Sequence, residues 1–247
     1  MNERMQILGI TIDPLTMKET VDAVEQYVLK NHPLHLMGVN ADKINQCYED
    51  EKIKKIVNES GIINADGASV VLASKFLGSP VPERVAGIDL MQNLLELSNK
   101  KGYSVYFFGA KEEILQDMLK VFKQRYPNLN VVGYRNGYFS PEDEKKIQED
   151  IKERKPDFVF VGITSPKKEY IIQSFMDNGI NTVFMGVGGS FDVLSGHINR
   201  APLWMQKLNL EWLFRVVNEP KRLFKRYFVG NVTFIKRVLD EKRKSKK

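Results

Sequence analysis

Cysteine, histidine and long apolar runs are all scarce in this chain of 247 residues. Cys47 is the single cysteine, so no disulfide can form within the chain and a thiolate metal site is not expected. The three histidines, His32, His35 and His197, do not have the spacing of zinc ligands. No run of eighteen apolar residues is present, so no transmembrane helix is expected.

The N-terminus has no basic segment followed by an apolar stretch and a small-residue cleavage site. We therefore expect the protein to stay in the cytosol. Hydrophobic residues make up 43% and charged residues 28% of the chain, which is ordinary for a soluble globular protein. One large domain with an appendage is the economical interpretation.

Charge is distributed unevenly along the chain. Residues 200–247 carry 14 Lys and Arg against four acids, a net charge of +10, whereas residues 1–199 carry 23 bases against 27 acids, a net charge of −4. This asymmetry indicates an anionic partner for the C-terminal end, either nucleic acid or acidic lipid. Bulky apolar residues such as Trp204, Trp212 and Phe224 are interleaved with these bases, which is typical of a helix on a membrane surface. We expect a core over residues 1–195 and a basic amphipathic appendage over residues 196–247.

The apolar residues of the appendage have a second interpretation as a subunit interface. Both interpretations hold if the appendage switches between self-association and lipid. We therefore expect a homo-oligomer away from the membrane and a peripheral protein on it.

Short apolar runs alternate with stretches of helical periodicity. This alternation predicts an α/β fold with a mostly parallel sheet covered by helices on both faces. The expected strands are 7–12, 34–39, 62–65, 103–108, 129–132, 158–163 and 182–187, and the expected helices are 16–29, 67–77, 88–99, 112–125, 142–154 and 166–176. Ligands of open α/β sheets bind beyond the carboxyl ends of the strands, so the site is expected there.

Several residues near those strand ends are candidates for chemistry. Asp66 follows the strand 62–65 and has the chemistry of a general base, although Asp is also a common helix N-cap. Gly188 and Asp192 lie in a glycine-rich turn that a phosphate or sugar can approach closely, but the spacing is not that of a dinucleotide-binding fingerprint. Arg84 is either a surface residue or a cation for an anionic substrate. Lys168 lies in the first turn of a helix, where a cation is mildly unfavourable, so it either serves an anionic ligand or is a solvated lysine.

Four segments together resemble the WecG/TagA/CpsF glycosyltransferases, glycosyltransferase family 26: residues 83–89, 186–196, 200–202 and 211–222. The resemblance runs from about residue 7 to residue 227. It implies a Rossmann-like fold of the GT-E type, with an appendage that reaches the bilayer and completes the active site. It also implies a metal-independent, inverting transferase that needs no cofactor, and the chain has no Asp-x-Asp motif of the kind that holds a divalent ion.

The resemblance further implies the substrates. Members of the family pass a sugar such as N-acetylmannosamine or its uronic acid from UDP to an undecaprenyl-diphosphate-linked saccharide. They act at the cytoplasmic face of the bacterial plasma membrane. Their products enter wall teichoic acid, enterobacterial common antigen or capsule.

Roles for individual residues follow from the same resemblance. Asp66 matches the base that deprotonates the acceptor hydroxyl, and Arg84 matches a residue in contact with phosphate or sugar. Asn40 matches a sugar-pocket residue, and Asp192 and Tyr138 match contacts to the donor nucleoside.

The appendage supplies a second set of candidate residues. Arg215 and Arg222 match arginines that clamp a diphosphate, with Lys225 or Arg226 in the third place. On an ideal helix, at ~100° per residue, Arg215, Arg222 and Arg226 fall within ~20° of one another. Pro220 interrupts that helix.

Two positions depart from the family pattern. The usual Thr-x-Asn reads Gly38-Val39-Asn40, which removes a hydroxyl, and the usual Pro-Lys-Gln-Glu has Lys168 in place of the amide. We hypothesise that Lys168 pairs with a uronate or a phosphate of the donor. Two alternatives stay open, a non-catalytic member that binds lipid-linked sugar or a partner, and a nucleic-acid-binding protein. Retention of Asp66 favours catalysis, and the slightly acidic remainder of the chain disfavours specific nucleic-acid binding.

Overall fold

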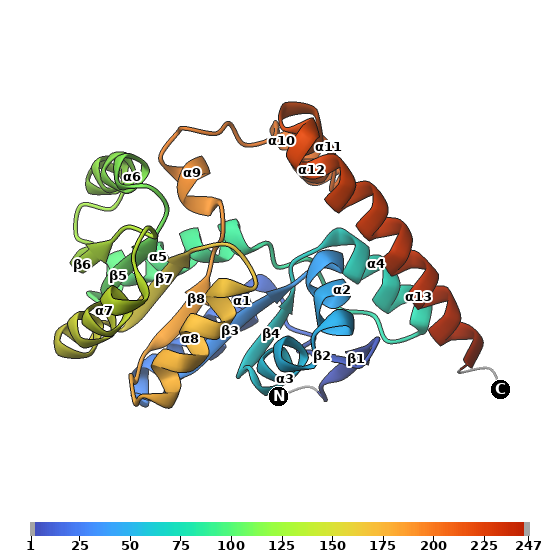
Figure 1. Ribbon diagram of the computed structural model, residues 1–247, viewed down its shortest axis with the longest axis horizontal. Coiled ribbons are helices and arrows are strands. Elements are labelled where there is room, and N and C mark those ends of the chain that lie inside the picture. The colour runs from blue at the N-terminus through green and yellow to red at the C-terminus, as the bar shows by residue number, and fades with distance from the viewer. Residues whose placement is uncertain (1–2, 245–247) are drawn as a thin grey trace.

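The computed structural model describes residues 3–244, apart from the side chains of Arg222, Lys225 and Arg226. Its main body is a six-stranded parallel sheet in the order β4-β3-β8-β7-β5-β6, with helices on both faces (Figure 1). The strands are β3 (Leu34–Val39), β4 (Ile62–Ala65), β5 (Ser104–Gly109), β6 (Asn130–Arg135), β7 (Phe158–Gly162) and β8 (Val183–Gly186). The α/β class and the parallel sheet predicted from the sequence are confirmed.

The helices cover the two faces in separate groups. One face packs against α1 (Met17–Leu29), α5 (Gly87–Lys101) and α6 (Glu112–Arg125). The other packs against α2 (Ala41–Glu49), α3 (Glu51–Glu59), α4 (Ala68–Leu77), α7 (Pro141–Arg154) and α8 (Lys167–Asp177). Both faces of the sheet are therefore buried, which explains why its strands read as continuous apolar runs.

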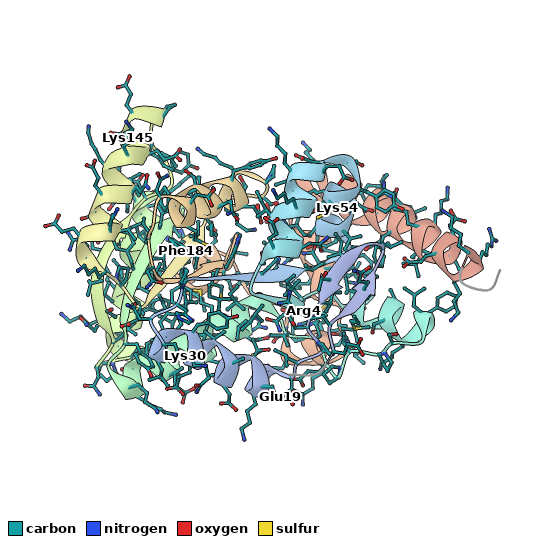
Figure 2. The ribbon with its side chains drawn as sticks, turned by 90° about the horizontal axis from the view of Figure 1, so that it is seen from below. Arg4, Glu19, Lys30, Lys54, Lys145 and Phe184 are labelled. Atoms are coloured by element: carbon teal, nitrogen blue, oxygen red, sulfur yellow. The ribbon has the colours of Figure 1, made fainter. Side chains whose placement is uncertain are left out.

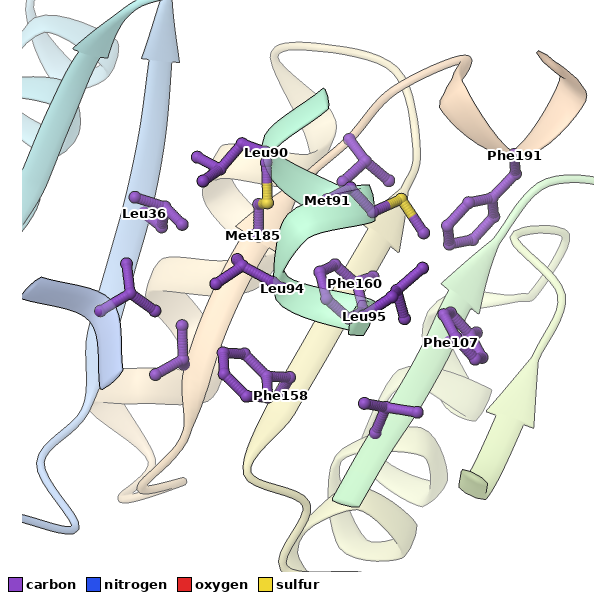
Figure 3. Close-up of a cluster of buried hydrophobic side chains, with 14 of the residues drawn as sticks. Leu36, Leu90, Met91, Leu94, Leu95, Phe107, Phe158, Phe160, Met185 and Phe191 are labelled. Carbon is purple, nitrogen blue, oxygen red and sulfur yellow. The ribbon is translucent and has the colours of Figure 1, made fainter. Parts of the chain in front are cut away.

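Successive strand residues point to opposite faces and build separate parts of the core. Phe107 and Phe160 pack with α5 residues in the cluster of Figure 3, and their ring centroids are 5.8 Å apart. Tyr106 belongs to the cluster on the other face. Phe184 of β8 lies in the interior, whereas Lys145 extends from the periphery (Figure 2).

Three expectations about the elements need correction. Residues 7–12 are not one strand, because β1 (Met5–Ile7) and β2 (Ile10–Ile12) form an antiparallel hairpin whose turn places Leu8 and Gly9 at φ of 55° and 73°. Helices α2 and α3 occupy a stretch where no helix was predicted. They are short and rich in charged residues, and Asp50 separates them by capping the start of α3. Strand β6 reaches Arg135 rather than residue 132.

After β8, the chain continues through α9 (Ser190–Leu194), α10 (Leu203–Lys207), α11 (Glu211–Asn218), α12 (Pro220–Phe224), a π-helical turn (Lys225–Val229) and α13 (Gly230–Lys244). Helix α13 runs along α2 and α4 (Figure 1) and buries Phe234 and Val238 against them. Its Glu241 carboxylate accepts a hydrogen bond from the Leu8 amide at 2.8 Å. The C-terminal segment thus packs on the core.

The backbone of this segment corrects the helical alignment of its arginines. The helix break before Pro220 and the π-helical turn lie between Arg215 and α13. As the position of Pro220 indicated, Arg215, Arg222 and Arg226 do not share one uninterrupted α-helix, so the alignment expected on an ideal helix does not apply to them. Within residues 3–244, no helix is long and apolar enough to cross a bilayer.

Candidate active site

Asp66 and Asn40 lie next to each other at the carboxyl edge of the sheet. Val39 of β3 pairs with Ala65 of β4, so each polar residue directly follows its strand. The Asp66 amide donates to the Val39 carbonyl at 2.9 Å. The Asn40 side chain accepts from the Lys43 amide at 3.0 Å and caps α2. The sheet thereby brings together two residues that the sequence suggested separately.

The Asp66 carboxylate interacts with the start of α5. Its Oδ1 accepts a hydrogen bond from the Gly87 amide at 2.9 Å. Helix α4 begins after Gly67 without a side-chain cap, so Asp66 does not cap the helix that follows it. Burial raises the pKa of Asp66, although the Gly87 amide and the charges of Arg84 and Arg215 act in the opposite direction. A raised pKa suits a carboxylate that must take a proton from a hydroxyl.

Gly38 lies directly beside this carboxylate. A Cβ atom at position 38 would be 3.3 Å from the Asp66 Cβ and 3.7 Å from its Oδ2. The Thr that the sequence resemblance implies at this position would therefore contact the candidate base. Glycine places no side chain beside Asp66.

Arg84 is held at the same end of the sheet. The Val85 amide donates to the Ala65 carbonyl at 2.9 Å, which fixes the loop across the end of β4. The Arg84 Nη2 lies 2.5 Å from Oε2 of Glu211 on α11, and only 18% of the Arg84 side chain is exposed. Arg84 is therefore not a solvated surface residue, and its charge acts on Asp66.

Glu211 also binds a second arginine. Its Oε1 accepts from Arg200 Nε at 3.2 Å, and Arg200 donates to both carboxylate oxygens of Asp89 at 2.6 and 2.8 Å. The sequence alone indicates no function for Glu211, Arg200 or Asp89. The segments that contain them were among those that carried the resemblance, but neither their pairing nor their proximity to Arg84 can be read from spacing.

The diphosphate-binding candidates of the appendage are described only in part. Arg215 is exposed on α11, and its charge partly opposes the rise that burial causes in the pKa of Asp66. Glu211 of the same helix binds Arg84, so α11 lies near the end of β4 that Asp66 follows. The side chains of Arg222, Lys225 and Arg226 lie outside the described part of the structure.

The candidates for the donor side follow β8. Gly188 has a φ of +52°, and an added Cβ there would meet nothing within 4 Å. Asp192 lies within α9 and does not cap it. Ser195 and Ile198 donate to its main-chain carbonyl, and no hydrogen bond to its carboxylate is found among the residues whose side chains the structure describes. This turn therefore leaves both backbone and a carboxylate available to a ligand.

Lys168 crosses the end of β8. A Cβ on Gly186 would come within 2.6 Å of its Cε, so the glycine makes room for the lysine stem. Its Nζ lies 3.3 Å from Oε1 of Glu169, and its side chain is 16% exposed. Lys168 therefore already has a counter-charge within the protein, the Glu169 carboxylate, whether or not it also binds an anionic group of the donor.

Glu169 and Lys43 form a buried ion pair that the sequence did not reveal. Lys43 Nζ lies 2.7 Å from Glu169 Oε1, and the side chains are 6% and 0% exposed. Burial alone would raise the pKa of Glu169, but the charges of Lys168 and Lys43 outweigh burial and hold this pKa below its ordinary value. Neighbouring His35 is also buried, and burial lowers its pKa to about 4. The one sequence feature that pointed to this ion pair was Lys43 in the first turn of α2, a helix that the sequence did not predict.

Tyr138 is not brought to Asp66. It follows the edge strand β6, is 69% exposed and borders a hollow of about 390 Å³ with Lys111, Glu112 and Asn136. Five strand spacings, roughly 24 Å, separate β6 from β4, the strand that Asp66 follows. Within residues 3–244, no cluster of three or more His, Cys, Asp or Glu residues has the geometry of a metal site.

The fold and this site define an α/β protein with a carboxylate, Asp66, and arginines from two segments at the carboxyl edge of its parallel sheet. The family model described as "Glycosyl transferase WecG/TagA/CpsF family" matches residues 5–247. The chain therefore belongs to this family and is a glycosyltransferase, as the sequence resemblance indicated.

Similar proteins extend over nearly the whole chain. The N-acetylglucosaminyldiphosphoundecaprenol N-acetyl-beta-D-mannosaminyltransferase of Staphylococcus aureus strain MW2 is 32% identical over 246 residues, 99% of this chain and 95% of the relative. Proteins of the same name from strains NCTC 8325 and MRSA252 match with the same identity and coverage.

Proposed function

We propose that this chain transfers N-acetylmannosamine or a related sugar, with inversion, from a UDP-sugar to the N-acetylglucosamine of an undecaprenyl-diphosphate-linked acceptor. The observation that carries the proposal is the partly buried Asp66 carboxylate, which lies at the carboxyl edge of the sheet and is acted on by the charges of Arg84 and Arg215. The names of the S. aureus relatives, which match along 99% of this chain, support the sugar and the acceptor.

The proposed reaction is a single displacement at the anomeric carbon. One Asp66 oxygen, Oδ1, is engaged by the Gly87 amide, which leaves Oδ2 to accept the proton of the acceptor hydroxyl. The acceptor oxygen forms the new bond to the anomeric carbon while the bond to the UDP oxygen breaks on the opposite face. Arg84 and Arg215 stabilise the diphosphate charge that develops on the leaving group.

The donor is proposed to lie along the ends of β3 and β8. Asn40 would contact the sugar, and Gly188 and Asp192 would contact the phosphate or nucleoside. Tyr138 would contact the far end of the nucleoside across the intervening strands. Lys168 would meet a donor phosphate or a uronate, in addition to Glu169.

Membrane contact is proposed for the C-terminal segment. Its helices expose many large apolar side chains next to the basic residues. Only a few apolar residues of this segment are buried. The exposed residues are Leu203, Trp204, Leu208, Trp212, Leu213, Val217, Phe224, Phe228, Val229, Val232, Ile235 and Leu239. Such a surface suits the interface of an anionic bilayer, where each Lys or Arg near the surface contributes ~1 kcal/mol. The lipid-linked acceptor would place this surface on the inner face of the plasma membrane.

A donor panel tests the reaction. Purified protein is incubated with UDP-N-acetylmannosamine, its uronic acid and UDP-N-acetylglucosamine, together with an undecaprenyl-diphosphate-N-acetylglucosamine analogue. The proposal expects an acceptor-dependent disaccharide-lipid from the mannosamine donor or its uronic acid. Binding of donor without any product would instead support the non-catalytic alternative.

Vesicle co-sedimentation tests membrane contact. Binding should increase with the fraction of anionic phospholipid and decrease with added salt. Binding that does not depend on anionic lipid would remove the electrostatic part of the proposal. Duplex DNA, added at the same total negative charge as the vesicles, competes with them for the protein and tests the nucleic-acid alternative.

A further inference from the structure

Glu211 joins the C-terminal segment to the candidate active site. It is the first residue of α11, and its carboxylate lies between the guanidinium groups of Arg84 and Arg200. Arg200 in turn binds Asp89 in the first turn of α5 through two hydrogen bonds. The four side chains form a row of alternating charge, which we call the Glu211 bridge: Arg84, Glu211, Arg200 and Asp89.

The burial of the Glu211 bridge distinguishes it from a surface ion pair. The side chains of Glu211, Arg84 and Arg200 are 13%, 18% and 22% exposed. Arginine keeps its charge at any pH that a folded protein tolerates, so a partly buried guanidinium needs a fixed acceptor. Without the Glu211 carboxylate, Arg84 and Arg200 would face each other without a counter-charge. Arg84 would then move away from its present place.

Movement of Arg84 would directly affect the proposed reaction. The charges of both Arg84 and Glu211 act on Asp66, with opposite effects. The same guanidinium is proposed above to stabilise the leaving diphosphate. A shift of about 1 Å in a group that positions a reaction can lower the rate by about 10²-fold.

We propose that Glu211 is a positioning residue, which holds Arg84 beside Asp66 only when α11 is docked on the core. The inference rests on the proposed function, because it assigns Glu211 a role in that reaction. It also gives the C-terminal segment a task in assembling the site that is separate from membrane contact. Glu211 itself does not touch the reacting atoms.

The test compares Glu211→Gln with Glu241→Gln. Glu241 is a matched control, because it also joins the C-terminal segment to the core, through the Leu8 amide at 2.8 Å, and lies on α13 rather than α11. For Glu211→Gln we expect kcat to fall about 10- to 100-fold, with KM for both substrates within about threefold of wild type. Glu241→Gln should retain the kcat of wild type.

Docking of α11 has an independent readout. Both tryptophans of the chain, Trp204 and Trp212, lie on α10 and α11, so intrinsic fluorescence reports on this segment alone. Glu211→Gln should shift the emission, and Glu241→Gln should not. If Glu211→Gln fails to fold, Arg200→Lys replaces it, because a lysine keeps the charge but cannot bind Glu211 and Asp89 in the same geometry.

The outcomes separate this inference from the proposed function. Wild-type kcat in Glu211→Gln, or in Arg200→Lys if that variant is used, would overturn the positioning role while leaving the transferase intact. Faster turnover would also overturn it, since Glu211 would then be competing with substrate for Arg84. Absence of transfer by wild type would overturn both, while an emission shift in Glu211→Gln would still confirm the structural contact.

Discussion

Glu169→Gln should destabilise the protein strongly, although the two side chains are nearly equal in size. The carboxylate is 0% exposed and faces Lys43 at 2.7 Å and Lys168 at 3.3 Å. The amide keeps the volume of the side chain, so no cavity is created. Lys43, which is 6% exposed, loses its counter-charge and cannot reach water. Lys168 is 16% exposed and has a shorter path to solvent.

The expected loss of stability is set mainly by Lys43, because it is more buried than Lys168. Removing one partner of a buried ion pair costs about 3 to 5 kcal/mol. Lys43 keeps a hydrogen bond to Ser165 Oγ at 2.5 Å, which retains part of its solvation. We therefore expect the lower end of that range, about 3 kcal/mol. Because total stabilities are about 5 to 15 kcal/mol, such a loss should be large enough to shift the unfolding midpoint clearly.

Urea unfolding followed by circular dichroism measures the effect. Lys43→Met/Glu169→Gln should be less destabilised than the sum of the two single variants, because the second substitution no longer strands a charge. The matched control is Glu96→Gln, which breaks an exposed Lys100–Glu96 pair and should leave the midpoint unchanged.

The same substitution has a defined pH dependence. Since the pKa of Glu169 is lowered in the folded protein, its contribution is fully present above the ordinary carboxyl value of 4.5 and is lost as pH falls through the lower folded value. The difference between wild type and Glu169→Gln should therefore shrink in acid. A midpoint change in Glu169→Gln no larger than that in Glu96→Gln at neutral pH would refute the reasoning.

Three further predictions concern other parts of the molecule. Gly38→Ser should place a hydroxyl against Asp66, lower its pKa and shift the acidic limb of the kcat/KM pH profile to lower pH; an unchanged limb would mean that Asp66 does not control it. Cys47 is 1% exposed and burial raises its pKa to about 11, so the native protein should react with a disulfide reagent only slowly and urea-unfolded protein rapidly. Gly109→Ala should lower the thermal midpoint, because φ is +138° there and the new Cβ would lie 2.4 Å from the Gly162 carbonyl carbon; an unaltered midpoint would contradict this.

The sequence predicted those features that depend on local pattern. Buried strands read as apolar runs because both faces of the sheet are covered, and the positions of Asp66 and Asn40 follow from strand ends. Helices α2 and α3 were missed because each has only nine residues and many of these are charged or polar. The break at Gly9 was missed because a two-residue turn within an apolar run leaves the run looking continuous.

Side-chain pairing across long sequence separations was beyond local pattern. Arg84 and Glu211 are 127 residues apart, and Lys43 and Glu169 are 126 apart. Strand order is equally invisible along the chain, so the distance of Tyr138 from the other candidates appeared only when β6 took its place at the sheet edge. The sequence indicated Lys168 as a candidate site residue. It did not indicate that the lysine stem packs on Gly186 or that its ammonium group lies near Glu169.

The most direct test of the account is the acceptor-dependent transfer rate of wild type and Asp66→Asn. The substitution keeps the size of the side chain and its acceptor for the Gly87 amide, but removes the base. With UDP-N-acetylmannosamine and the lipid-linked acceptor, the account predicts product formation by wild type and at least a 10²-fold lower kcat in a folded Asp66→Asn variant. Equal rates in the two proteins would contradict the assignment of Asp66 as the base on which the proposed mechanism depends.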